Sequence, residues 1–380
     1  MQIGQREISD DAPVYIIAEV GVNHDGDPQK AVDLVDMAAS AGADAVKVQV
    51  FRAEMLMSKT ATLAEYQRDA GEADPAEMLR RLELDEDSLA SVIERARGHG
   101  MQAIGTVFSP GIVRTAEALG FDAYKTASPD IVNKPLLESL SATGKPLIVS
   151  TGASELWEVR RAFKWLDGAR ERLALLQCVS CYPTLPEEAS IAAMLTLHAM
   201  SGLTVGYSDH TTEEDTGALA VSIGARILEK HLTYDPLAFG PDHGASLGPE
   251  AFARYCRAAR EERPGSAAEI GEAMDSAWLA SDPRFGDGQK RVLDCEKDVR
   301  RVSRQSLALL RPKKAGETIN RNDLTTMRPG TGLSPALIDE ASGRKASCDL
   351  QAGVILTSGD VQPPLEDIAK IGPRAGAIGL

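Results

Sequence analysis

The segment ARILEKHLTYD, which begins at Ala225, ends a short apolar run on three consecutive ionisable residues, Glu229, Lys230 and His231. An unpaired charge is costly inside an apolar core, so a strand should not enter the core with these residues. Side chains alternate along a strand, which places Glu229 and His231 on the same face. We interpret the three residues as a strand end at the rim of the fold, where charged groups can meet a ligand.

A second histidine, His210, ends the preceding apolar run in the motif GYSDHT. Neighbouring strands lie about 4.8 Å apart, so the imidazoles of His210 and His231 could share one cation. Two histidines leave an open site with room for oxygen ligands, which suits Mn²⁺ or Co²⁺ better than a closed zinc site does. Two alternatives remain open: His210 could cap the helix that TTEED begins, and either imidazole could simply form a hydrogen bond.

Two lysines also stand near strand ends, Lys47 in AVKVQVF and Lys125 in KTAS. Either amine could form a Schiff base with a carbonyl substrate, or could hold a phosphate or carboxylate as a point charge. The motif VSTGAS, around Ser150, places hydroxyls and a glycine before a predicted helix, which is a common cradle for anions. The residues alone leave both uses of the lysines open.

Two further motifs carry less information. CVSC, from Cys178 to Cys181, has the spacing of a redox or zinc motif, but no second pair accompanies it, so we interpret it as two structural thiols. SDH, at Ser208, has the letters of a hydrolytic triad, but consecutive strand residues point to opposite faces and no nucleophile elbow is present.

Eight β-branched, apolar runs alternate with helical patterns over the first 263 residues. The runs begin at residues 14, 45, 101, 122, 146, 172, 202 and 226. Alternation of this kind requires right-handed crossovers between parallel strands, either in an open doubly wound sheet or in a closed barrel. Eight repeats without a glycine-rich dinucleotide motif favour an α/β fold of the (β/α)₈ TIM-barrel type.

Polar residues gather where these strands end, which is where such barrels carry their active sites. A single residue of this kind is commonly solvated or caps a helix, but a polar end on every strand favours one shared site. The residues at the strand ends are Glu19, Lys47, Gln49, Thr106, Lys125, Ser128, Ser150, Gln177, Ser180, Asp209, His210, Glu229 and His231.

The pattern changes after residue 263. Residues 264–302 are charged and irregular and are predicted to be a linker with helical portions. Residues 303–365 contain short strands broken by Gly, Pro and Asn turns and are predicted to form a small β-rich domain, followed by a tail over residues 366–380.

Composition limits the partners and the compartment. A net charge of −15 over 380 residues argues against nucleic acid, although a local cluster could still hold a small anion. No run approaches the roughly 20 apolar residues of a membrane helix, and the N-terminus lacks the layout of a secretory signal. Five cysteines in such a chain predict reduced thiols and a cytoplasmic protein.

The motifs IIAEVGVNHDG, AVKVQVF, KTAS, PLIVSTG, GYSDHT, LEKHLT and GPDHGASL together resemble the sialic acid synthase family. SRQSLALLRPKKAGETINRNDLTTMRPGTGL resembles the antifreeze-like (SAF) domain of those synthases. The resemblance implies condensation of phosphoenolpyruvate with the aldehyde of an N-acylated hexosamine, giving a nonulosonic acid and phosphate. It also implies a divalent cation, usually Mn²⁺ with Co²⁺ or Mg²⁺ as alternatives, and a domain-swapped homodimer.

The resemblance assigns roles to matching residues of this chain. His210 and His231 would bind the metal, and Glu19 would orient or deprotonate a water. Lys47, Thr106, Lys125, Ser128 and Ser150 would contact phosphoenolpyruvate; Gln49, Ser180, Tyr182, Asp242 and Arg328 would contact the sugar side, Arg328 in the barrel of the partner chain.

The chain departs from the family pattern at three points, namely TVFS at Thr106, Pro129 in place of a glycine, and Ser180 in place of an asparagine. Proline removes a backbone N–H that a relative could use. These changes leave the hexosamine open between N-acetylmannosamine and diacetamido-trideoxyhexoses. Two other functions also stay open, a pyruvate aldolase that uses Lys47 or Lys125 and a non-catalytic sugar-binding protein.

Overall fold

The computed structural model describes residues 1–9, 11–263 and 282–366. Its largest part is a closed barrel of eight parallel strands in chain order, in which the last strand pairs with the first. This arrangement confirms the predicted TIM barrel. The strands are β3 (Tyr15–Gly21), β4 (Ala45–Val50), β5 (Gln102–Val107), β6 (Ala123–Thr126), β7 (Leu147–Ser150), β8 (Leu173–Cys178), β9 (Val205–Asp209) and β10 (Ile227–His231).

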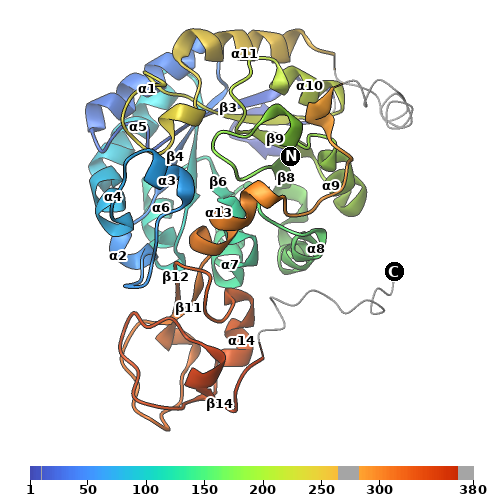
Figure 1. Cartoon of the computed structure of the whole chain (residues 1–380). Helices are drawn as coiled ribbons and strands as arrows, with labels where there is room; N and C mark the ends of the chain where they lie inside the picture. Colours follow the sequence, from blue (N-terminus) through green and yellow to red (C-terminus); the bar gives the residue numbers. More distant parts are fainter. Residues whose placement is uncertain (10, 264–281, 367–380) are drawn as a thin grey trace.

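Helices surround the barrel, as Figure 1 shows. They are α1 (Pro28–Ala41), α5 (Glu86–Gly98), α6 (Val113–Leu119), α7 (Lys134–Ala142), α8 (Leu156–Trp165), α9 (Ala193–Ser201), α10 (Thr216–Ser222) and α11 (Pro249–Glu261). Their ends follow from local chemistry, as α1 illustrates: the Asp27 carboxylate accepts hydrogen bonds from two backbone N–H groups, and Gly42 takes the left-handed conformation (φ 89°) that ends the helix.

The inside of the barrel is apolar at one end and polar at the other. Ile17, Ile104, Ile148 and Ile227 belong to a buried cluster inside the strands. Two residues further along the same strands stand Glu19, Thr106, Ser150 and Glu229, all buried. Because side chains repeat a face every second residue, the isoleucines fix the inward direction of the polar groups that follow them.

Two features near the barrel were not expected from the sequence. An N-terminal hairpin, β1 (Gln2–Ile3) and β2 (Arg6–Glu7), brings Ile3 and Ile8 into the inner apolar cluster at the end opposite the polar groups. The long connection after β4 folds into α2 (Ala53–Leu56), α3 (Glu65–Asp69) and α4 (Pro75–Leu82).

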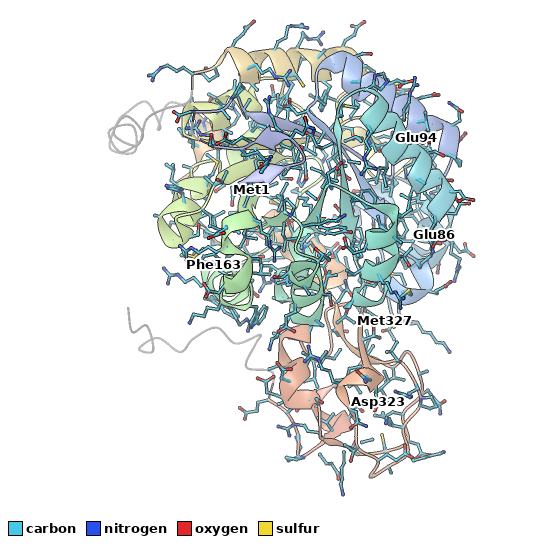
Figure 2. All side chains as sticks on the ribbon, turned by 180° about the vertical axis from the view of Figure 1, so that it is seen from behind. Met1, Glu86, Glu94, Phe163, Asp323 and Met327 are labelled. Carbon is cyan, nitrogen blue, oxygen red and sulfur yellow. The ribbon has the colours of Figure 1, made fainter. Side chains whose placement is uncertain are left out.

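A small β-rich domain lies below the barrel in Figure 1. It contains the antiparallel pairs β11 (Ser306–Leu309) with β12 (Leu324–Met327) and β13 (Lys345–Ala346) with β14 (Val361–Gln362), and the short helix α14 (Ile338–Ala341). Leu307, Ile319 and Leu356 belong to its own apolar core. Figure 2 labels Met327 where β12 meets the barrel and Asp323 further out in the small domain.

The described part of the connection to this domain packs against the barrel. It comprises the 3-10 turns η7 (Pro283–Phe285) and η8 (Asp294–Glu296) and the helix α13 (Lys297–Ser303). Arg300 and Arg304 of this connection both pair with the fully buried Glu158 of α8. Residues 264–281 of the predicted linker and residues 367–380 of the predicted tail lie outside the described residues.

Candidate active site

A cavity of about 120 Å³ opens at the carboxyl ends of the barrel strands. It brings together most of the residues that the sequence singled out, although they come from five strands, several loops and the small domain. The predicted residues that line it are Glu19, Lys47, Gln49, Thr106, Lys125, Ser128, Tyr182, His210, His231, Asp242 and Arg328.

One side of the cavity carries two buried lysines, each held by a carboxylate. Lys47 forms an ion pair with Glu19 and donates a hydrogen bond of 2.9 Å to Thr106 Oγ1. Lys125 Nζ lies 2.8 Å from Glu229 Oε1, and Lys47 Nζ lies 3.8 Å from Glu229 Oε2. Two cations and two carboxylates therefore alternate around one wall, which we call the lysine side.

The charges on the lysine side shift each other's pKa. Burial lowers the pKa of Lys47, but Glu19 and Glu229 outweigh burial and leave this pKa raised. Burial raises the pKa of Glu229, but Lys125 and Lys47 outweigh burial and lower it to about 2. For Glu19 burial prevails and the pKa is raised, which makes its carboxylate the more basic of the two.

The loop after β7 packs closely against two serines at Gly152. A Cβ atom at Gly152 would lie 2.4 Å from Ser180 Oγ and 2.8 Å from Ser128 Oγ, so only glycine leaves this space free. The hydroxyls of Ser150 and Ser180 are buried without a hydrogen-bond partner among the described residues. Ser150 and Ser180 do not line the cavity itself, but Ser180 lies beside Ser128, which does.

The opposite side of the cavity carries the two histidines. The rings of His210 and His231 lie 5.4 Å apart between centroids, and His210 Nδ1 is 2.7 Å from the carbonyl oxygen of Val179. His231 Nδ1 is buried without a hydrogen-bond partner among the described residues and lies 3.8 Å from Asp242 Oδ2. We call this wall the histidine side.

This geometry fits a divalent cation. Burial lowers the pKa of His231 well below its usual value, so its imidazole is neutral, as a metal ligand must be. The bond from His210 Nδ1 to Val179 fixes that ring and leaves Nε2 as its free donor atom. Asp242 adds an oxygen donor next to His231. Nitrogen and oxygen donors in an incomplete set suit an open site.

Tyr66, Tyr182, Phe108 and Arg328 also line the cavity, and we call this group the roof. The rings of Tyr66 and Tyr182 lie 5.0 Å apart, and Tyr182 lies 4.2 Å from His210. Arg328 stands over the ring of Phe108 at 5.6 Å, and its Nε is buried without a hydrogen-bond partner among the described residues.

Arg328 comes from the small domain and is held against the barrel by backbone contacts. Its N–H donates to the carbonyl oxygen of Leu56, and its own carbonyl oxygen accepts from the N–H of Ser58. Sequence analysis expected Arg328 in the barrel of a partner chain; in this structure it lines the cavity of its own chain.

Sequence analysis left three residues out of the proposed site. Glu229 was noted as an inward-facing strand residue but received no role, although it joins both lysines. Ser208 donates a hydrogen bond of 2.8 Å to Glu229, and its position on β9, two residues before His210, was a usable signal. Tyr66 lies on α3, within a connection that carries no recognisable motif, so nothing in the sequence marked it.

The two thiols of CVSC have different surroundings. Cys178 Sγ lies 3.7 Å from His210 Nδ1 and lines the cavity. Cys181 belongs to a separate cluster with Glu188 and Cys295.

Comparison with known proteins identifies the family of this chain. Residues 34–266 match the NeuB family, and residues 304–362 match the SAF domain. The chain is 37% identical over 349 residues to N,N'-diacetyllegionaminic acid synthase of Legionella pneumophila, covering 90% of this chain and 93% of that protein. It is 35% identical to N,N'-diacetyllegionaminic acid synthase of Campylobacter jejuni, covering 87% and 95%.

Solved structures show the same architecture. The spore coat polysaccharide biosynthesis protein SpsE of Bacillus subtilis superposes with a TM-score of 0.78 at 27% identity, covering 97% of this chain and 99% of that one. N-acetylneuraminic acid synthetase of Leptospira borgpetersenii superposes with a TM-score of 0.61 at 29% identity, covering 74% and 97%. The chain therefore belongs to the NeuB family of nonulosonic acid synthases, enzymes of phosphoenolpyruvate condensation, and carries their C-terminal SAF domain.

Proposed function

We propose that this enzyme condenses phosphoenolpyruvate with the open-chain aldehyde of a diacetamido-trideoxyhexose and releases phosphate and a legionaminic-type nonulosonic acid. The observation that carries the reaction is the meeting of Lys47, Lys125, His210 and His231 in one cavity with paired carboxylates. The identity of 37% and 35% to two N,N'-diacetyllegionaminic acid synthases supports the choice of sugar.

The lysine side would receive phosphoenolpyruvate. Its phosphate and carboxylate groups match the two ammonium groups of Lys47 and Lys125. Ser150, at the end of β7, and Ser180, beside Gly152, add hydroxyls without a hydrogen-bond partner among the described residues. Holding both anionic groups fixes the enol carbon relative to the aldehyde, which turns an encounter of two substrates into an oriented reaction.

The proposed reaction needs no oxidant or reductant. The enol carbon forms a bond to the aldehyde carbon, and the aldehyde oxygen takes up a proton and becomes a hydroxyl. Water adds to the former enol-phosphate carbon, and the bond from that carbon to the phosphate oxygen breaks. Glu19 would accept a proton of this water, since its carboxylate lines the cavity and burial raises its pKa.

His210 and His231 would hold a divalent cation, with Asp242 as a neighbouring oxygen donor. When bound, such a cation polarises the aldehyde oxygen and stabilises the negative charge that develops on it. Mn²⁺ is the ion we propose, because nitrogen and oxygen donors suit it. Tyr182, packed 4.2 Å from His210, would limit the movement of that ring.

The structure argues against the aldolase alternative. A Schiff-base lysine must be neutral to attack a carbonyl, whereas Glu19 and Glu229 keep the pKa of Lys47 raised. Borohydride trapping with pyruvate is therefore expected to leave Lys47 unmodified, and the ion pair of Lys125 with Glu229 leads to the same expectation for Lys125. An imine found at either lysine by mass spectrometry would replace the proposed mechanism.

A panel of sugars tests the substrate. Phosphate release from phosphoenolpyruvate is measured with N-acetylmannosamine and with the diacetamido-trideoxyhexose precursors of legionaminic and pseudaminic acids. We expect the legionaminic precursor to give the highest kcat/KM. Release with none of the three sugars would favour a non-catalytic sugar-binding protein.

The contacts that the connecting segment and the small domain make with the barrel could also form between the two chains of a homodimer. A domain swap exchanges identical elements between protomers, so residues 282–366 could make the same contacts with a partner's barrel. Mixing Arg328→Ala chains with His231→Ala chains tests this arrangement. Partial recovery of activity is expected; no recovery in demonstrated heterodimers would mean that each barrel uses its own arginine.

A further inference from the structure

A second group of metal-type ligands lies outside the cavity, where the connection to the small domain touches the barrel. Cys181 follows β8, Glu188 ends the 3-10 turn η4 (Pro186–Glu188), and Cys295 lies in η8. The two Sγ atoms and one carboxylate oxygen all lie within 4.8 Å of one another. All three residues are partly buried, so an ion from solvent could reach them.

We propose that Cys181, Glu188 and Cys295 bind one zinc ion, which fastens the connecting segment to the barrel and is separate from the catalytic cation. In a tetrahedral site with Zn–S bonds of about 2.3 Å, two sulfur atoms lie about 3.8 Å apart. Small side-chain movements would therefore complete the site. Both thiols lose their protons on binding, and a water molecule takes the fourth position.

The chemistry of the ligands selects this ion. Thiolates are soft ligands that favour zinc, whereas Mn²⁺ and Mg²⁺ favour the oxygen and nitrogen donors of the histidine side. A disulfide would use the two sulfurs and leave the third member, Glu188, without a role.

Hydrogen bonds next to both cysteines hold the site in place. One carboxylate oxygen of Glu296 accepts from the backbone N–H of Ala153 at 2.6 Å and from that of Ser180 at 2.8 Å. Its other oxygen accepts from Leu293 N–H at 2.9 Å. Glu296 follows Cys295 and Ser180 precedes Cys181, so this one buried carboxylate joins the backbones that carry both thiols.

The segment that follows Glu188 also forms backbone hydrogen bonds with the segment that connects the barrel to the small domain. The N–H groups of Ile191 and Ala192 each donate a hydrogen bond of 2.9 Å, to the carbonyl oxygens of Arg284 and Phe285 respectively. Each ligand therefore lies within a few residues of a backbone contact between the barrel and the segment 282–303. A zinc ion here would link the same two parts that these contacts join.

Metal binding by the full chain tests the proposal. After chelator treatment under reducing conditions, the protein is titrated with Co²⁺ as a probe, followed by Zn²⁺. The wild type is expected to show a thiolate-to-cobalt absorption band that one equivalent of Zn²⁺ removes. Cys181→Ser and Cys295→Ser should lose the band, and Glu188→Gln should weaken binding by at least about tenfold.

Cys348→Ser is the matched control, because this exposed thiol lies in the small domain, outside the cluster, and its variant should keep the band. Circular dichroism checks that each variant is folded. A band that persists in Cys295→Ser would belong to Cys178 beside His210 and would overturn the proposal. So would wild-type protein without a band, including protein whose mass shows that the two thiols have formed a disulfide.

Discussion

The two sides of the catalytic cavity differ in how their ionisable groups are paired. On the lysine side, Lys47 and Lys125 are paired with Glu19 and Glu229 before any substrate arrives. On the histidine side, His231 Nδ1 has no hydrogen-bond partner among the described residues. Glu229 Oε2 on the lysine side also lacks a hydrogen-bond partner among the described residues, but it lies 3.8 Å from Lys47 Nζ. The lysine side thus balances its own charges, whereas a cation would complete the histidine side.

The largest effect is expected on the histidine side. His231→Ala should lower kcat by at least about a thousandfold, because the group that stabilises charge on the aldehyde oxygen is lost. Isothermal titration with Mn²⁺ should show a matching loss of binding. His99→Ala, at an exposed ion pair with Asp36, is the control and should leave both measurements unchanged. Wild-type Mn²⁺-dependent turnover in His231→Ala would remove the metal assignment.

Lys125→Met should have an intermediate effect on the lysine side. Losing one charge-assisted contact of about 1.5–3 kcal/mol should raise the KM for phosphoenolpyruvate by about 10- to 150-fold. Because Glu229 is left short of a partner, the free energy of unfolding should fall as well.

The double variant Lys125→Met/Glu229→Gln separates these two effects. It should regain part of the lost stability in a denaturant titration, while the KM for phosphoenolpyruvate stays high. An unchanged KM in both variants would mean that Lys125 is a structural residue and that the two sides of the cavity do not differ in the way described.

Arg328→Ala should have a smaller effect, confined to the sugar. Its guanidinium has a buried Nε without a partner in the roof, and losing a hydrogen bond from it should raise the KM for the hexosamine about tenfold. The KM for phosphoenolpyruvate should stay constant. Arg311→Ala is the control, since Arg311 pairs with Asp323 within the same domain and is largely exposed. Equal changes in both KM values would show that the roof merely closes the cavity.

A separate effect, on stability and not on turnover, concerns pH at the edge of the roof. Burial raises the pKa of Asp130 to about 6, against lowering by Arg328 and by hydrogen bonds from Asn133 and Gln305. The folded state therefore holds its proton more tightly than the unfolded state, so this contribution to stability is full below about pH 4 and is lost as pH rises through about 6.

Asp130→Asn should remove that pH dependence. Between pH 4 and 7, the free energy of unfolding of the wild type should fall relative to that of the variant by an amount on the order of 3 kcal/mol. Denaturant titrations at several pH values measure this difference. Parallel curves for the two proteins would show that Asp130 titrates normally.

The sequence predicted what depends on strand periodicity. Glu19, Lys47, Lys125, His210 and His231 each follow an apolar strand pattern, and the closure of eight parallel strands forces their ends together. Tyr66 and Glu296 could not be predicted in this way. Their positions depend on how irregular segments pack against the barrel, and no residue period records that packing.

The cavity takes its lining from Glu19, near the start of the chain, and from Arg328, near its end. A ribosome adds roughly 5–20 residues per second, so the strands of the barrel leave it well before the small domain is made. An incomplete or C-terminally truncated chain would present both lysines and both histidines without their roof. Sugar recognition as proposed above thus depends on a domain that is synthesised after the barrel, which delays turnover until that domain is in place.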